Sequence, residues 1–339
     1  MKTKLRASEP AKDSEKPVAY SMDAQYGPLF SKLDFRPVFI VGDHRSGTTL
    51  LYQILAATGC FHVLTAYQVI HYDEIVTHFM EGRTETARLD LEKRFAELGT
   101  SDRVFDGVRV TPDLPEEYGF VIEDSARPRL RPSNRGRLVE LCQKLRLIGG
   151  SDKPVLLKNP WDVLSFVSLK ESFPQAKLIF LHRHPLAVIN SQLRAIRSMM
   201  EAPNDYLRLI ARWYPRVWDS RIRRQFMRQV FSGRLPLWRY IVPRHVARAG
   251  SYFLANFNCI PAADAICFRY EDICRNPSGN IEAILRFLQI EPEAAVDYAA
   301  LIDKRPTNLL PEVVRYRTQI LRPMRPYLDR FHYGQDVDN

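Results

Sequence analysis

The sequence predicts an α/β fold built on a mainly parallel, doubly wound sheet. Short runs rich in β-branched and aromatic residues alternate with segments whose apolar residues recur at helical spacing. The run 176–181 is almost continuously apolar, which is typical of a strand buried on both faces. Because alternating strands and helices favour crossover connections, the strands should run parallel. Five strands are expected, at 38–41, 61–65, 155–157, 176–181 and 265–268.

The segments between these strands predict the helices that cover the sheet. Pro185 is suited to a first helical turn, where its missing N–H costs nothing. Residues 203–258 are expected to form a helical, arginine-rich insertion. The other expected helices begin at Thr48 or span 74–98, 134–147, 161–173, 185–200 and 277–288.

The chain should form a single domain over residues 36–335, after a flexible polar leader over residues 1–35. The leader lacks the apolar segment of a signal peptide, and the chain has no apolar run of about 18 residues that would predict a membrane span. Five cysteines without a C-x-x-C pair indicate reduced thiols rather than a disulfide framework or a zinc site. These features together favour a cytoplasmic protein.

The composition favours an anionic partner. The 339 residues carry a formal net charge of +10, and 45% of them are apolar, which is enough for a core. Such a balance is typical of proteins that bind a nucleotide, a nucleic acid, a sulfated or phosphorylated substrate, or a membrane surface.

An anion cradle is predicted directly after the first strand. The segment Gly42-Asp43-His44-Arg45-Ser46-Gly47-Thr48-Thr49 places a glycine turn between a strand and a helix start. Nucleotide-triphosphate loops have a lysine where this chain has Thr48, and the strong cation here is Arg45. An ATP-dependent kinase or NTPase would therefore lack its phosphate-binding lysine.

Two further cations follow buried strands. Lys158 comes after the strand at 155–157, and Arg183 comes after the strand at 176–181. The carboxyl ends of parallel strands lie at one edge of a sheet, so Arg45, Lys158 and Arg183 should meet there. Ser191 lies eight residues beyond Arg183, about two turns into the next helix.

Four blocks of the chain resemble the PAPS-dependent sulfotransferases, especially the branch with protein-tyrosine and bacterial sulfotransferases. They are FIVGDHRSGTTLL, VLLKNPWDVLSFVSLKESFPQAKLIFLHRHPLAVINS, RYEDICRNP and RPTNL. The resemblance implies a P-loop-like fold, 3′-phosphoadenosine-5′-phosphosulfate (PAPS) as the donor and PAP as the product. It further implies that Lys158 lies by the sulfuryl oxygens and that Arg183 and Ser191 hold the 3′-phosphate. The phosphosulfate would be bound by Arg45, Ser46, Gly47, Thr48 and Thr49, and the nucleotide by Tyr270 and Arg305.

Sulfuryl transfer can proceed without a metal, because the transferred group bears less charge than a phosphoryl group. Arg45 and Lys158 are the expected catalytic cations. The protein-tyrosine branch has a glutamate base shortly after its second strand, where this chain has Ala66-Tyr67-Gln68. The nearest candidates for the general base are His71, Asp73 and Glu74. His71 is the first choice, because imidazole titrates near neutrality and other branches of the family use histidine, and Glu74 is the second. The accepting group is expected to be a hydroxyl, with a phenol or an amine as alternatives. The acceptor itself stays open among small molecules such as phenols and polyketides, glycans, lipids and peptides.

Residues 208–248 contain eleven arginines and one acidic residue, Asp219, with aromatic residues between them. They fit either a structural insertion or an amphipathic lid that contacts an amphiphilic acceptor or a membrane surface. A kinase and a non-enzymatic nucleic-acid-binding protein remain as alternatives. The first would need magnesium and ATP, and the second would bind single strands with a steep salt dependence. We expect a sulfotransferase that binds no nucleic acid; the sequence leaves its oligomeric state open.

Overall fold

The computed structural model describes residues 21–103, 107–123, 128–232, 237–292, 296–302 and 308–334. Its centre is a five-stranded sheet in which all paired strands run parallel, in the order β2-β3-β1-β4-β5. The strands are β1 (Pro37–Val41), β2 (His62–Val63), β3 (Val155–Lys158), β4 (Lys177–His182) and β5 (Ala265–Arg269). The predicted fold class is confirmed, although the second strand is much shorter than expected.

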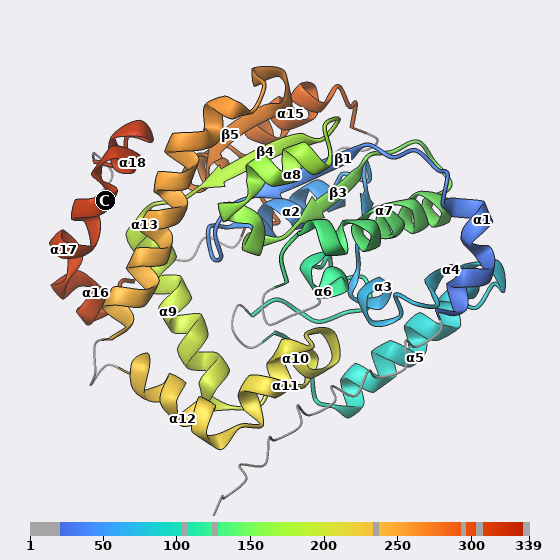
Figure 1. Ribbon diagram of the computed structural model, residues 1–339, viewed down its shortest axis with the longest axis horizontal. Helices are drawn as coiled ribbons and strands as arrows, with labels where there is room; N and C mark the ends of the chain where they lie inside the picture. The colour runs from blue at the N-terminus through green and yellow to red at the C-terminus, as the bar shows by residue number, and fades with distance from the viewer. Residues whose placement is uncertain are drawn as a thin grey trace, which may run out of the picture.

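Helices cover both faces of the sheet (Figure 1). The alternation along β1 explains this arrangement, because successive side chains of a strand point to opposite faces. Val38 and Ile40 pack in a cluster with α2 and α15, whereas Phe39 and Val41 pack in another with α7, α8 and α13. These helices are α2 (Thr48–Ala57), α7 (Arg135–Gly149), α8 (Phe166–Ser172), α13 (Trp238–Asn256) and α15 (Pro277–Leu288).

Figure 1 shows α9 (Pro185–Glu201) running away from the sheet and α13 returning to it. Three short helices of the expected arginine-rich insertion connect them, and C-terminal helices pack along the pair. The connecting helices are α10 (Asp205–Ile210), α11 (Trp213–Trp218) and α12 (Arg221–Val230). The C-terminal helices are α16 (Pro311–Arg315), α17 (Arg317–Leu321), η6 (Arg322–Met324) and α18 (Arg325–Arg330).

Several expected elements differ in the structure. The helix expected at 74–98 is two helices, because Gly82 turns the chain with a φ of +67° between them. The helix expected at 161–173 begins as a 3₁₀ helix and is interrupted at Ser165, whose φ of −147° and ψ of 22° are not helical. The elements concerned are α4 (Ile75–Met80), α5 (Thr84–Glu97), η3 (Pro160–Leu164) and α8.

The flexible leader expected over residues 1–35 also extends too far along the chain, because its last part is folded. Residues 21–35 carry η1 (Met22–Tyr26) and α1 (Gly27–Phe30), and Phe30 is buried. Asp23 is buried as well, where it forms an ion pair with Lys144 and accepts hydrogen bonds from Thr77. This part of the predicted leader is therefore wrong; residues 1–20 lie outside the described residues.

The remaining helices are α3 (Ala66–Ile70), α6 (Gly119–Ile122), α14 (Tyr270–Arg275), η2 (Pro132–Asn134), η4 (Phe257–Cys259) and η5 (Ala262–Asp264). Within the described parts of the chain, none of the helices has both the length and the hydropathy needed to span a bilayer.

Candidate functional site

The glycine turn between β1 and α2 has the backbone geometry of an anion cradle. Gly47 is the N-cap of α2 with a φ of +97°, and Arg45 has a φ of +69°. A Cβ atom at Gly47 would lie 2.2 Å from Cδ2 of Tyr270, so only glycine fits. No side chain caps the first turn of α2. Its backbone N–H groups therefore offer a site for an anion.

Residues from neighbouring strand ends join this loop, as the sequence predicted. The strands β3, β1 and β4 are adjacent, so Lys158, the loop and Arg183 emerge side by side. Arg45 Nε donates to Ser191 Oγ at 3.0 Å, and the Arg183 guanidinium donates to the Arg45 carbonyl at 3.1 Å. Arg183 also lies over the ring of Tyr270, 4.2 Å from its centroid.

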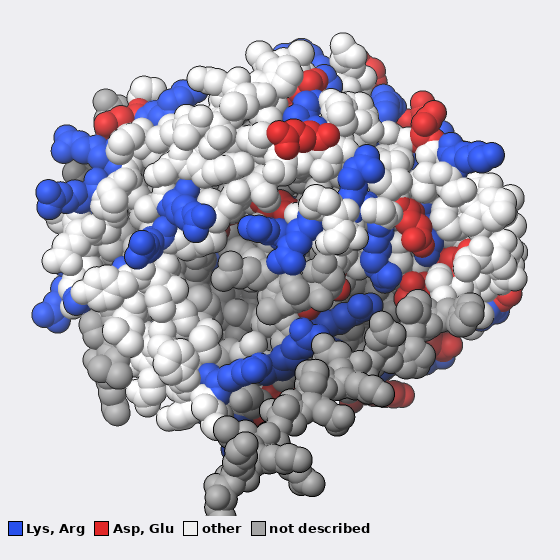
Figure 2. Space-filling model, in the orientation of Figure 1, with Lys and Arg blue, Asp and Glu red and all other residues white. Residues whose placement is uncertain are grey.

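These residues border a cavity of about 570 Å³, which we call the loop cavity. Figure 2, in the orientation of Figure 1, shows a hollow at the centre of the visible face, with Lys and Arg side chains at its border. Lys158 is buried beside the cavity, and its Nζ donates to Thr49 Oγ1 at 3.4 Å and to Glu117 Oε1 at 2.7 Å. The predicted residues that line the loop cavity are Arg45, Gly47, Thr48, Thr49, Arg183, Ser191 and Tyr270.

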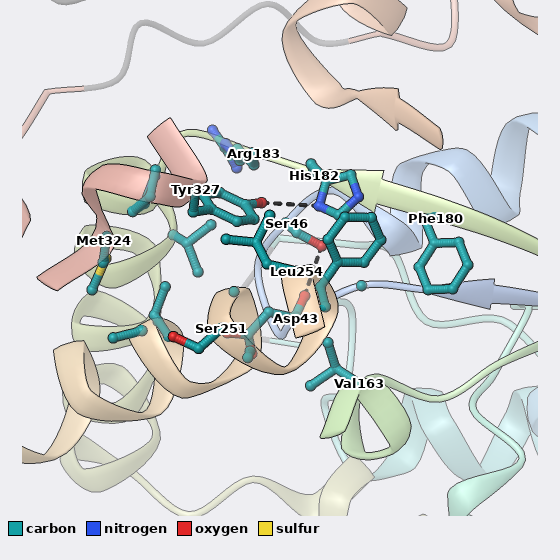
Figure 3. Close-up of a pocket in the computed structure, with 18 of the residues that line it drawn as sticks. Asp43, Ser46, Val163, Phe180, His182, Arg183, Ser251, Leu254, Met324 and Tyr327 are labelled. Carbon is teal, nitrogen blue, oxygen red and sulfur yellow. Dashed lines mark hydrogen bonds between the residues drawn. The ribbon is translucent and has the colours of Figure 1, made fainter. Parts of the chain in front are cut away.

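Ser46 is placed differently from the other loop residues. Its hydroxyl is buried and donates to the Asp43 carbonyl at 2.7 Å. Figure 3 shows Ser46 at a second cavity of about 370 Å³, the rear cavity, which lies between the loop, α13 and the C-terminal helices. There His182 is hydrogen-bonded to Tyr327 at 3.0 Å, and burial lowers the pKa of His182 to about 3. The Ser46 hydroxyl thus holds the loop together rather than facing the loop cavity.

A third cavity, of about 270 Å³, meets the loop cavity. We call it the tryptophan cavity because Trp161 and Trp213 belong to its walls. Four residues line both it and the loop cavity: His44, Arg45, Arg103 and Glu117. The two cavities therefore meet at these four residues.

Glu117 and His44 are functional candidates that the sequence did not indicate. Burial alone would raise the pKa of Glu117, but the Lys158 ammonium, with help from Arg103, holds that pKa below its usual value. Burial lowers the pKa of His44, which favours the neutral imidazole. Its Nε2 is buried without a hydrogen-bond partner in the described part of the chain. Glu117 is thus an ionised carboxylate at neutral pH, and His44 a neutral ring.

The structure does not bring His71 or Glu74 to this junction. His71 Nδ1 lies 2.5 Å from Glu74 Oε1, and His78 Nε2 lies 3.9 Å from Glu74 Oε2. The three residues line a separate cavity that shares none of its residues with the loop or tryptophan cavities. Their ligand atoms lie within 4.8 Å of one another, an arrangement that could hold a divalent metal. It is not adjacent to the predicted cations.

The arginine-rich segment is partly structural. Arg223, Arg224 and Arg228 donate to the carbonyls of Arg216, Trp218 and Met200, near the ends of α11 and α9. Tyr214, Trp218 and Trp238 are buried. Ile222 and Phe226 of α12 are 84% and 66% exposed, and a membrane contact through them stays a prediction. Arg305 lies outside the described residues.

The sequence contained only weak signals for the missed residues. His44 lies inside the loop motif, next to Arg45, which carries the permanent positive charge of the loop. Glu117 belongs to the run Pro115-Glu116-Glu117 in an aperiodic stretch far from the second strand. Its neighbour Glu116 donates its backbone N–H to the Leu64 carbonyl, which carries this stretch to the end of β2. The pairing of Glu117 with Lys158 is thus a tertiary contact between segments that are far apart in the sequence.

Comparisons with known proteins identify the family of this chain. A family model described as "Sulfotransferase family" matches residues 37–294, most of the chain. The sulfotransferase STF9 from Mycobacterium avium is similar with a TM-score of 0.60 at 17% identity, over 90% of this chain and 79% of that chain. The sulfotransferase STF1 from Mycobacterium tuberculosis is similar with a TM-score of 0.52 at 17% identity, over 83% of this chain and 73% of that chain.

No curated protein matches significantly. At such identities the solved structures show the shared fold, whereas the family model shows the family. The chain therefore belongs to the sulfotransferase family and is an enzyme of the sulfotransferase type.

Proposed function

We propose that the protein transfers a sulfuryl group from PAPS to a hydroxyl group of its acceptor. The observation that carries the proposal is the meeting of Arg45, Lys158 and Arg183 beside the uncapped N-terminus of α2. PAPS supplies a sulfuryl group on a phosphate leaving group. Three cations and helix N–H groups are the partners that such a polyanion requires.

The lining of the loop cavity offers partners for both anionic groups of this donor. The 5′-phosphosulfate is held by the loop backbone with Thr48 and Thr49, whose backbone N–H groups belong to the first turn of α2. The 3′-phosphate is held by the Arg183 guanidinium and the Ser191 hydroxyl. A contact from Arg305 stays a prediction.

Glu117 is the general base in this proposal, in place of His71 or Glu74. The acceptor oxygen forms a bond to sulfur, the bond from sulfur to the phosphate oxygen of PAP breaks, and Glu117 takes the hydroxyl proton. Lys158 neutralises the negative charge that develops on the sulfuryl and leaving-phosphate oxygens. Its contacts with both Thr49 and Glu117 support this assignment, because they link the donor loop to the base.

Calorimetry with PAP and with ADP tests the donor. The wild-type protein should bind PAP much more tightly than ADP, because ADP lacks the 3′-phosphate. Arg183→Ala should weaken PAP binding by about 10- to 100-fold, since it removes charge-assisted hydrogen bonds of about 1.5–3 kcal/mol. ADP binding should change less.

Arg286→Ala is the matched control, since Arg286 is exposed on α15. It should bind PAP as the wild type does. Equal affinities of the wild type for PAP and ADP would overturn the proposed donor. Turnover that depends on magnesium and ATP would favour a kinase instead.

A further inference from the structure

The tryptophan cavity has walls unlike those of the loop cavity. Its apolar side chains come from five separate elements, α6, η3, α9, α10 and α11. They include Phe120, Trp161, Ile196, Met199, Leu207 and Trp213. Such walls favour an apolar ligand, and aromatic walls add specific edge and face contacts with a ring.

Three of the four Arg and Glu side chains at this cavity are already engaged in ion pairs, and the fourth, Arg45, is assigned to the donor in the proposed function. Arg103 donates to Glu116 at 2.9 Å, and the Tyr206 hydroxyl donates to the same carboxylate at 2.6 Å; both members of the ion pair are buried. Glu117 is paired with Lys158. A charged acceptor would lose its hydration here without gaining an opposite charge that lacks a partner, so binding it would be unfavourable.

The cavity is also small. Its volume of about 270 Å³ lies just below the range of about 300–1,000 Å³ that is typical of pockets for drug-sized ligands. It therefore suits a compact molecule of one or two rings better than an extended glycan or a peptide.

The junction of the two cavities indicates where the reactive hydroxyl group of an acceptor would lie. The junction of the two cavities carries the Glu117 carboxylate and the His44 ring, which contacts Trp161 edge-on with centroids 4.7 Å apart. The buried Nε2 of His44 requires a hydrogen-bond partner, and an acceptor hydroxyl can provide one. We infer that the tryptophan cavity binds a compact, uncharged phenol, with its ring between the tryptophan-bearing walls and its hydroxyl at His44 and Glu117. This inference rests on the proposed sulfuryl transfer.

The lowered pKa of Glu117 is a second reason to infer a phenol rather than an aliphatic alcohol as the acceptor. The pKa of Glu117 is held low by Lys158 after burial has raised it, so this carboxylate is a weak base. A phenolic hydroxyl has a pKa of about 10, whereas an alkyl hydroxyl is far less acidic. Proton transfer to Glu117 is correspondingly easier from the phenol.

The test compares acceptors of similar size with PAPS as the donor. The compounds are 4-methylphenol, the anion 4-hydroxybenzoate, the cation tyramine and the aliphatic 4-methylcyclohexanol. We expect kcat/KM for 4-methylphenol to exceed the values for the others by about 10- to 100-fold. The two ions would lose hydration at the apolar walls, and the hydroxyl of the alcohol is much less acidic than that of the phenol. Phe226→Ala, which removes an exposed ring from α12, should leave all values unchanged.

Variants of the walls connect the preference to this cavity. Trp161→Ala and Trp213→Ala should each raise KM for 4-methylphenol by about 10-fold while PAP affinity stays constant. Met199→Lys should shift the ratio of kcat/KM from 4-methylphenol toward 4-hydroxybenzoate, because it places a cation on the apolar wall. Binding of 4-methylphenol without donor should also change the tryptophan fluorescence of the wild type and less that of Trp161→Phe.

PAP calorimetry distinguishes failure of this inference from failure of the proposed function. If PAP does not bind selectively, the donor assignment fails first. If PAP binds selectively but a charged compound, the aliphatic alcohol or a tyrosine peptide is the best acceptor, the inference about the cavity is wrong. Turnover of none of the compounds with PAP binding intact, or wall variants with unchanged KM, would overturn it as well.

Discussion

The loop cavity and the tryptophan cavity meet at four residues but are built in opposite ways. The loop cavity is the more polar of the two, and its predicted residues follow strands β1, β4 and β5 or lie in the helices after them. The tryptophan cavity is mainly apolar and depends on short helices from distant parts of the chain. A parallel sheet positions strand ends by its topology alone, whereas the apolar walls require specific packing between helices. We therefore expect donor binding and acceptor binding to respond separately to substitutions, except at the junction.

The largest effect should come from the junction itself. Glu117→Gln keeps the shape of the side chain but removes the proton acceptor, so kcat should fall by about 10²- to 10⁴-fold with PAP affinity nearly unchanged. His71→Asn should retain wild-type kcat, because His71 lines a separate cavity. Steady-state kinetics and PAP calorimetry measure both variants. The reverse result, with activity lost in His71→Asn and kept in Glu117→Gln, would return the base to the position expected from the sequence.

The next largest effect is expected from a substitution confined to the loop cavity. Gly47→Ala forces a side chain into a positive φ and toward the Tyr270 ring. We expect it to destabilise the fold by about 2–3 kcal/mol and to weaken PAP binding by 10-fold or more. Gly136→Ala is a suitable control, since a Cβ there meets no atom within 4 Å. Denaturant unfolding and calorimetry report the two effects. Wild-type PAP affinity in Gly47→Ala would show that the turn is not the anion cradle.

The pH dependence distinguishes the two candidate bases at the junction. The Lys158 ammonium outweighs the effect of burial and lowers the pKa of Glu117 below its usual value, so its carboxylate stays ionised as the pH falls through the neutral range. The value of kcat/KM for PAPS should therefore stay flat from about pH 8 to about pH 5 and decline only below that range. A decline near pH 6 that disappears in His44→Asn would instead identify His44 as the base. The profile must be measured where circular dichroism shows the protein to be folded.

The smallest effect should come from the arginine-rich segment, outside both cavities. Arg224 donates to the Trp218 carbonyl at 2.8 Å and lies over the Trp218 ring. Arg224→Gln should lower the free energy of unfolding by about 1 kcal/mol and leave both KM values unchanged. Arg221→Gln, at the exposed start of the same helix, should cost almost nothing. A raised acceptor KM in Arg224→Gln would support the lid hypothesis, and lost binding to anionic vesicles would support the membrane hypothesis.

The sequence predicted the fold class and the turn residues and two arginines of the loop cavity, because these depend on local patterns. Arg45, Lys158 and Arg183 could be brought together from the strand ends alone, since adjacent parallel strands share an edge. Glu117 could not be found in this way, because it reaches Lys158 through a stretch that pairs with the end of β2. His71 fitted the expected distance along the chain, but the turn after α3 directs it to Glu74 and His78. The apolar walls left no motif at all, since their residues resemble ordinary core positions.

Initial-rate kinetics with both substrates varied test the central claim most directly. If the two cavities hold donor and acceptor at the same time, transfer is direct, and double-reciprocal plots at several fixed acceptor concentrations intersect. Parallel lines would indicate a covalent sulfo-enzyme formed after PAP has left. Intersecting lines with PAPS and 4-methylphenol are the predicted result; parallel lines would contradict simultaneous occupation of the loop cavity and the tryptophan cavity.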